Sequence, residues 1–178
     1  FVSPTVVERL AYEAFEEAAQ QNIRLFELRF SPDWAFREHD LDWDAAFDGI
    51  LRAKERAEAR WPIAIGLIAI TSRTLGVESC EKTIDWAISK KEHIHGIDLA
   101  DAERTYPIEN FVVPVLKAKE AGLKVTVHTG EDTPASHVMR TIEAVRPDRI
   151  GHGIHVIEDQ VAIELVKAHN ITLEVCPW

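Results

Sequence analysis

The chain has 178 residues, of which 46% are hydrophobic and 28% charged, and its formal net charge is −10. These values are typical of a globular domain with a substantial core, and the acidic balance excludes a surface that tracks nucleic-acid phosphates. Two cysteines provide no disulfide framework and no apolar run is long enough to cross a bilayer, so we expect a cytoplasmic protein without nucleic-acid or membrane partners.

Helical and strand patterns alternate along the whole chain, and no linker divides it. Ser3 and Pro4 are suited to open the first helix as N-cap and first-turn proline. The residue pattern then predicts strands over 23–30, 62–70, 94–99, 123–128, 149–151 and 171–176. It predicts further helices over about 41–57, 77–89, 108–121, 135–145 and 158–169. Because alternating strands and helices form crossover connections, we expect residues 1–178 to be a single domain with six parallel strands.

Two α/β architectures fit this alternation, an open doubly wound sheet and a closed barrel. Glu27 and Arg29 share one face of the first strand, and Glu174 lies on the last strand. Charged side chains on central strands suit a polar barrel lumen better than a sheet face covered by a helix. We therefore predict a segment of a TIM-type (β/α)8 barrel that lacks the first and last strands. Six strands cannot close such a barrel, so we expect missing segments or other copies to complete it.

Polar residues gather where the predicted strands end, which is the edge at which parallel α/β folds assemble their active sites. The segments concerned are Arg29-Phe30-Ser31, Asp98-Leu99-Ala100-Asp101, His128-Thr129-Gly130-Glu131-Asp132, Gly151-His152-Gly153 and Cys176-Pro177. Any one of them could be an ordinary loop residue, but five at corresponding positions favour a functional site.

These segments, in this order, resemble the adenosine deaminase family. The resemblance is carried by Glu27-Leu28-Arg29-Phe30-Ser31-Pro32, Gly96-Ile97-Asp98-Leu99-Ala100, His128-Thr129-Gly130-Glu131, Arg149-Ile150-Gly151-His152-Gly153 and Leu173-Glu174-Val175-Cys176-Pro177. It implies a zinc-dependent barrel enzyme of purine salvage that deaminates adenosine or a related aminopurine, so a purine nucleoside or base is the expected partner.

The resemblance also implies roles for individual residues. His128 would be a zinc ligand (Zn2+), with the other ligands outside this chain, and His152 would orient the attacking water. Glu131 would donate a proton to the purine ring, a step that a carboxyl kept protonated by an enclosed site can perform. Gly130 would allow close approach of the substrate.

Two carboxylates, Asp98 and Glu174, are predicted to support this site from behind. Histidines at metal and catalytic sites usually have a carboxylate or carbonyl partner. Our hypothesis is that Asp98 supports the metal site and Glu174 supports His152. The alternative is a salt bridge inside the barrel with a neighbour such as Arg29.

Asp101 departs from the family pattern, which usually has glycine after Asp-Leu-Ala. The resemblance implies that a backbone amide approaches the purine there and that Glu103 lies near the site. An aspartate side chain would narrow or polarise the pocket, so Asp101 is predicted to affect which aminopurine binds. His93 and His95 spell His-x-His but begin a strand, so we expect them to lie away from the site.

Two other interpretations remain open. One is another barrel metallohydrolase, such as an amidohydrolase that acts on a cyclic amide. Glu131 three residues after His128 favours deamination, because protonation of the ring needs an acid there. The other interpretation is an inactive fragment, since the chain lacks the full set of zinc ligands.

Overall fold

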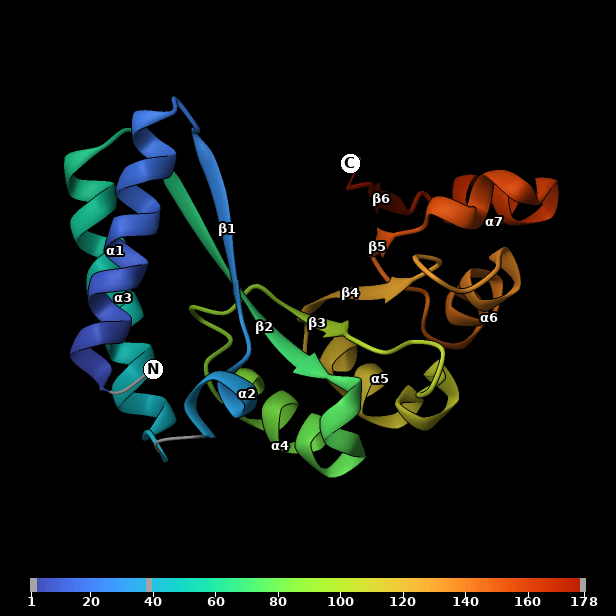
Figure 1. Cartoon of the computed structure of the whole chain (residues 1–178), viewed down its shortest axis with the longest axis horizontal. Helices are drawn as coiled ribbons and strands as arrows, with labels where there is room; N and C mark the ends of the chain where they lie inside the picture. Colours follow the sequence, from blue (N-terminus) through green and yellow to red (C-terminus); the bar gives the residue numbers. More distant parts are fainter. Residues whose placement is uncertain (1–2, 38–39, 177–178) are drawn as a thin grey trace. The chain divides into compact units, whose positions relative to one another are not determined.

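The computed structural model describes residues 3–37 and 40–176, in which strands alternate with helices (Figure 1). The strands are hydrogen-bonded in sequence order, β1 to β6. They are β1 (Leu25–Phe30), β2 (Ala64–Ser72), β3 (Gly96–Ala100), β4 (Lys124–Thr129), β5 (Arg149–His152) and β6 (Thr172–Glu174). The α-helices are α1 (Pro4–Gln20), α2 (Pro32–Phe36), α3 (Trp43–Arg60), α4 (Gly76–Ser89), α5 (Val112–Glu120), α6 (Ala135–Val145) and α7 (Gln160–Ala168). None of the helices in this part of the chain combines the length and apolar character of a membrane span.

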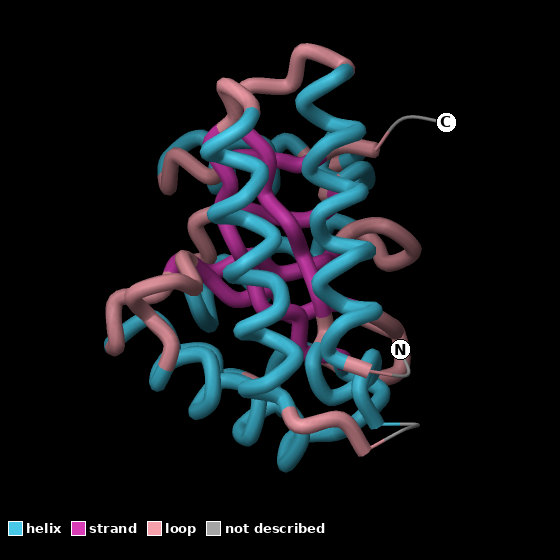
Figure 2. Tube along the Cα trace, turned by 90° about the vertical axis from the view of Figure 1, so that its left-hand side faces the viewer, coloured by secondary structure: helices cyan, strands magenta, loops and turns pink. Residues whose placement is uncertain are grey.

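The chain forms two compact units, residues 1–68 and 69–178. In the first unit, α1 and α3 lie side by side (Figure 2). Gly49 permits their close approach, because a Cβ there would stand 3.0 Å from the carbonyl oxygen of Pro4. Both Arg52 and Arg56 of α3 pair with one carboxylate of α1, that of Glu8.

Local capping explains where these helices begin. Ser3 caps α1 by accepting a hydrogen bond from the backbone N–H of Val6, which confirms the predicted N-cap. Asp42 does the same for α3, accepting from Ala45 at 2.8 Å. At the other end of a helix, Gly122 follows α5 with a φ of +94°, the left-handed conformation expected of a C-terminal glycine.

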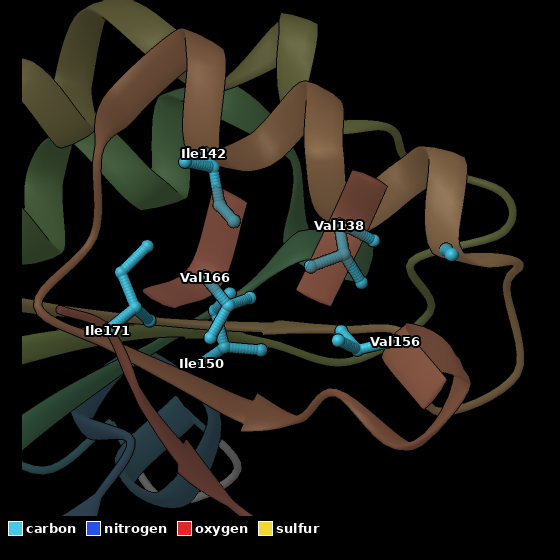
Figure 3. Close-up of a cluster of buried hydrophobic side chains, with 8 residues drawn as sticks. Val138, Ile142, Ile150, Val156, Val166 and Ile171 are labelled. Atoms are coloured by element: carbon cyan, nitrogen blue, oxygen red, sulfur yellow. The ribbon is translucent and has the colours of Figure 1, made fainter. Parts of the chain in front are cut away.

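In the second unit, β3 to β6 are parallel and have one apolar face. Its side chains are fully or largely buried: Ile97, Leu99, Val125, Val127, Ile150 and Leu173. Figure 3 shows Ile150 and Ile171 packed with Val138 and Ile142 of α6 and Val166 of α7. Burial of this face against the helices fixes the strand register, because a slip of one residue would turn every apolar side chain outward.

The structure differs from the sequence expectations at several ends. After the strand predicted over 23–30, Pro32 opens the short helix α2, which was not predicted; proline is well tolerated at the first helical position. The last strand ends at Glu174 rather than Cys176. The helix expected over 108–121 is a 3-10 turn at Ile108–Asn110 followed by α5.

Candidate active site

The opposite face of β3 to β6 is polar. The parallel register aligns Asp98 of β3 with Thr126 of β4, and Thr126 with Arg149 of β5. Two residues further along the strands, His128 of β4 lies beside Gly151 of β5, and Gly151 lies beside Glu174 of β6. Side chains two residues apart share a face. Asp98, His128 and Glu174 therefore lie on one surface, opposite the helices, whereas the register pairs His152 with Thr129, at the alternate positions.

Two histidine–carboxylate pairs stand at the ends of β4 and β5. His128 Nε2 lies 3.4 Å from the Asp98 carboxylate, whose side chain is fully buried. His152 Nε2 lies 3.3 Å from the Glu131 carboxylate, whose side chain is 58% exposed. The two imidazole rings meet edge to face, with centroids 5.0 Å apart. Four residues that the sequence placed in the site are thus brought together.

Gly151 provides the space that the His128 ring occupies. A Cβ at position 151 would stand 1.8 Å from His128 Cδ2 and 2.6 Å from Nε2. No side chain can be tolerated there unless the ring moves, which explains why glycine follows Ile150 at this point in the strand.

Replacing Gly151 by alanine in the full-length protein is expected to lower the free energy of unfolding by about 1–3 kcal/mol, the usual cost of overpacking. Urea denaturation measures this. The double variant Gly151→Ala/His128→Ala removes the ring that collides with the new methyl group, so its cost should be well below the sum of the single costs. Strictly additive costs would show that the collision is not the cause.

The loops after β4 and β5 are joined by backbone hydrogen bonds. Gly153 N–H donates to Thr129 O at 3.0 Å, and His155 N–H donates to Gly130 O at 3.2 Å. His152 itself has a φ of +67°, which is uncommon for a residue with a Cβ. This conformation ends β5, where the His152 ring lies beside Glu131.

Glu103, which the resemblance implied to lie near the site but to which no role was assigned, holds the loop after β4. Glu103 Oε2 accepts hydrogen bonds from Gly130 N–H (2.8 Å) and Thr133 Oγ1 (2.7 Å). Its Oε1 accepts from Glu131 N–H (2.9 Å) and Asp132 N–H (3.0 Å). Burial raises the pKa of the Glu103 carboxyl, but these four hydrogen bonds outweigh burial and lower the pKa to about 2. The group is therefore an anion at neutral pH.

Arg73 is a second buried charge next to this loop, with only 1% of the residue exposed. Its guanidinium donates to Tyr106 O at 2.7 Å and to His128 O at 3.0 Å. Burial lowers the pKa of Arg73 to about 10, and the charge of Glu103 opposes that shift. The predicted strand stopped at Ile70, so sequence reasoning did not place Arg73 at a strand end.

The Asp101 carboxylate binds the loop after β2. It accepts hydrogen bonds from Ser72 Oγ at 2.5 Å, from Thr74 Oγ1 and from Ala102 N–H at 2.8 Å. Burial raises the pKa of Asp101, but the hydrogen bonds from Ser72 and Thr74 outweigh it and lower the pKa. Its φ of +80° retains a backbone conformation that glycine adopts easily.

Glu174 accepts a hydrogen bond from Arg149 at 3.2 Å. This contact favours the salt-bridge interpretation of Glu174, although with Arg149 rather than with Arg29. Its proposed support of His152 stays a prediction. His93 and His95 are exposed at the opposite end of β3, as expected of residues away from the site.

The donor set for a metal is partial. An imidazole nitrogen of His128 and a carboxylate of Asp98 are chemically suited to zinc, and Gly151 leaves room around the ring. Yet within residues 3–37 and 40–176 no group of three or more His, Cys, Asp or Glu side chains could hold a metal ion. The described residues therefore hold no complete metal site.

The relatives that this chain matches include adenosine deaminases. The chain is 34% identical over 168 residues to an adenosine deaminase from Vibrio parahaemolyticus, an alignment that covers 94% of this chain and 50% of that protein. The chain thus spans about half the length of the curated relatives it matches.

Solved structures show the same fold. An adenine deaminase from Arthrobacter aurescens superposes with a TM-score of 0.90 at 26% identity, covering 99% of this chain and 54% of the other. An amidohydrolase from Burkholderia ambifaria with bound Zn superposes with a TM-score of 0.92 at 24% identity, covering 98% and 49% of the two chains. The prediction of a partial TIM-type barrel with six parallel strands is confirmed. A family model for adenosine deaminase matches residues 1–178. The chain belongs to the adenosine deaminase family.

Proposed function

We propose that the protein containing this chain hydrolytically deaminates adenosine or a related aminopurine to the 6-oxo product and ammonia. The observation that carries the proposal is the pairing of His128 with Asp98 and of His152 with Glu131 at adjoining strand ends. The relatives, an adenosine deaminase and an adenine deaminase, support an aminopurine as the substrate class.

Each residue has a task in this reaction. Attack of water at the ring carbon places negative charge on the adjacent ring nitrogen, and Glu131 donates a proton to that nitrogen. His152, 3.3 Å from Glu131, orients the attacking water. Gly130, which has no side chain and a φ of +72°, lets the purine approach the loop.

Zinc is the proposed cofactor, with His128 as the ligand that this chain supplies. The amidohydrolase from Burkholderia ambifaria has bound Zn, which supports this choice. A zinc ion supplies Lewis acidity that brings the pKa of a bound water to near neutrality. Asp98, 3.4 Å from His128 Nε2, is the carboxylate partner that orients the ring.

The test is the ultraviolet absorbance of adenosine and of adenine mixed with the full-length protein, after its zinc content has been measured. We expect loss of the aminopurine band, together with release of one ammonia per purine. A chelated sample serves as control and should regain activity when zinc is restored. No change with either compound in the zinc-loaded protein would exclude the proposal, and turnover of a cyclic amide would favour the amidohydrolase alternative.

Asp101 is the residue proposed to affect substrate preference. Asp101→Gly removes the carboxylate that accepts hydrogen bonds from Ser72 and Thr74. These two side chains should then be free to move. We expect the ratio of kcat/KM for adenosine to that for adenine to change about tenfold, the size of effect that small changes in pocket shape produce. Identical ratios in the variant and the parent would exclude a role in specificity.

A further inference from the structure

Glu103 accepts four hydrogen bonds near the site, although it lies on none of the strands. It is 6% exposed and sits in the loop after β3. Each of its two oxygens accepts two hydrogen bonds, all from the four consecutive residues 130–133. A carboxylate that binds three successive backbone N–H groups fixes the path of that backbone, because moving any one of them leaves a buried charge less well solvated.

The backbone that Glu103 fixes carries Glu131. Glu131 donates its own N–H to Glu103 Oε1 at 2.9 Å, while its side chain is exposed and reaches His152. Within the described part of the chain, His152 is the partner of the Glu131 carboxylate. The orientation of Glu131 relative to His152 thus depends on its backbone, which the buried carboxylate holds.

Two arginines strengthen the same connection. Arg104, next to Glu103, donates to the carbonyl oxygen of Asp132 and pairs with its carboxylate at 3.3 Å. Arg73 lies close enough for its charge to act on Glu103, and it donates to the carbonyl oxygen of His128. The loops after β2 and β3 therefore hold both ends of segment 128–132.

We propose that Glu103 is a positioning residue for the deamination, which fixes the 130–133 loop and so holds the Glu131 carboxylate at His152. This role rests on the proposed function for its catalytic consequence. Its structural part, the restraint of the loop, is independent of any activity.

The experiment compares Glu103→Gln with the parent in the full-length protein, using two readouts. Glutamine keeps the length of the side chain but offers one acceptor oxygen in place of two, so two of the four donors lose their acceptor. Amide hydrogen exchange at residues 130–132 should accelerate at least about tenfold. In the zinc-loaded enzyme kcat should fall about 10²-fold with KM little changed, as expected when a reacting group is misplaced by about 1 Å. Zinc content should stay the same.

Asp148→Asn is the matched control, because Asp148 accepts a backbone N–H from Val125 at the other end of β4. It should leave exchange at 130–132 and kcat unchanged. Thr133→Val is a milder variant for use if Glu103→Gln fails to fold. It removes one donor from Glu103 Oε2 while keeping the side-chain shape, and kcat should fall by roughly threefold to tenfold.

The outcomes separate the two proposals. Unchanged exchange at 130–132 in a folded variant would overturn the positioning role, and so would faster exchange with parental kcat. If the parent deaminates no aminopurine, the proposed function fails. Faster exchange would then support only the restraint of the loop by Glu103, and its catalytic role would fall with the proposed function.

Discussion

Glu131→Gln in the full-length protein is expected to lower kcat for the preferred aminopurine by about 10²–10⁴-fold, the range that general acid catalysis contributes. Glutamine retains the size of the side chain and can still contact His152, but it cannot donate a proton and become an anion. Binding of the substrate depends on other contacts, so KM should change much less than kcat. Steady-state rates from the absorbance assay give both parameters.

Glu158→Gln is the appropriate control for this substitution. Glu158 also pairs with a histidine, His155, at 2.9 Å, and its side chain is 58% exposed, the same fraction as that of Glu131. It lies in the turn after the site and has no proposed role, so its replacement should leave kcat unchanged. A Glu131→Gln enzyme that kept more than a tenth of the parental kcat would eliminate Glu131 as the proton donor.

Much of the architecture could be predicted from the sequence because the strands obey a strict alternation. Residues 97, 99, 125, 127 and 150 are apolar and lie on the helix-covered face, whereas Asp98 and His128 face the other side. A period of two, combined with parallel pairing, is enough to place polar residues of successive strands on a common surface. The rule does not account for His152, which the register pairs with Thr129 and alternation would place on the face of Ile150; its φ of +67° departs from the strand conformation.

The contacts that hold the site together could not be predicted in the same way. Glu103 follows β3 by three residues in an irregular turn, where neither helical nor strand periodicity indicates the direction of a side chain. Its partners are backbone N–H groups, which every residue except proline possesses, so their sequence gives no sign of the pairing. Arg73 was missed for a related reason, because β2 extends to Ser72, beyond the apolar run that marked the strand.

For Asp101, the sequence indicated an unusual position but not the contacts of its side chain. Its departure from the family pattern marked it as unusual, and the structure places it in the left-handed region with its carboxylate bound to Ser72 and Thr74. The sequence could indicate that the position was special. The direction of the Asp101 side chain depends on Ser72 and Thr74, which lie at the end of β2 and just after it. Their proximity to Asp101 follows from the folded chain and not from the sequence around position 101.

Glu103 should also govern how the stability of the protein depends on acid. The pKa of Glu103 is about 2 in the folded protein, against an ordinary value of 4.5. Because the folded-state pKa is the lower one, the ionised carboxylate stabilises the folded state, and protonation favours unfolding. This contribution is fully present above about pH 4.5 and is lost as the pH falls toward 2. A difference of this size corresponds to about 3 kcal/mol.

We therefore expect Glu103→Gln to lower the free energy of unfolding by about 3 kcal/mol at pH 7, with the deficit shrinking as the pH falls from about 4.5 to 2. Urea denaturation of both proteins across this range measures it. Asp101 and Asp148 also have lowered pKa values, but both proteins contain them, so their effects cancel in the difference. Arg73 and His137, which interact with Glu103, and the charged groups around His137 (Arg104, Glu109 and Arg140) are likewise common to both. A deficit that stayed constant down to pH 2 would mean that lost packing, rather than the lost charge, destabilises the variant.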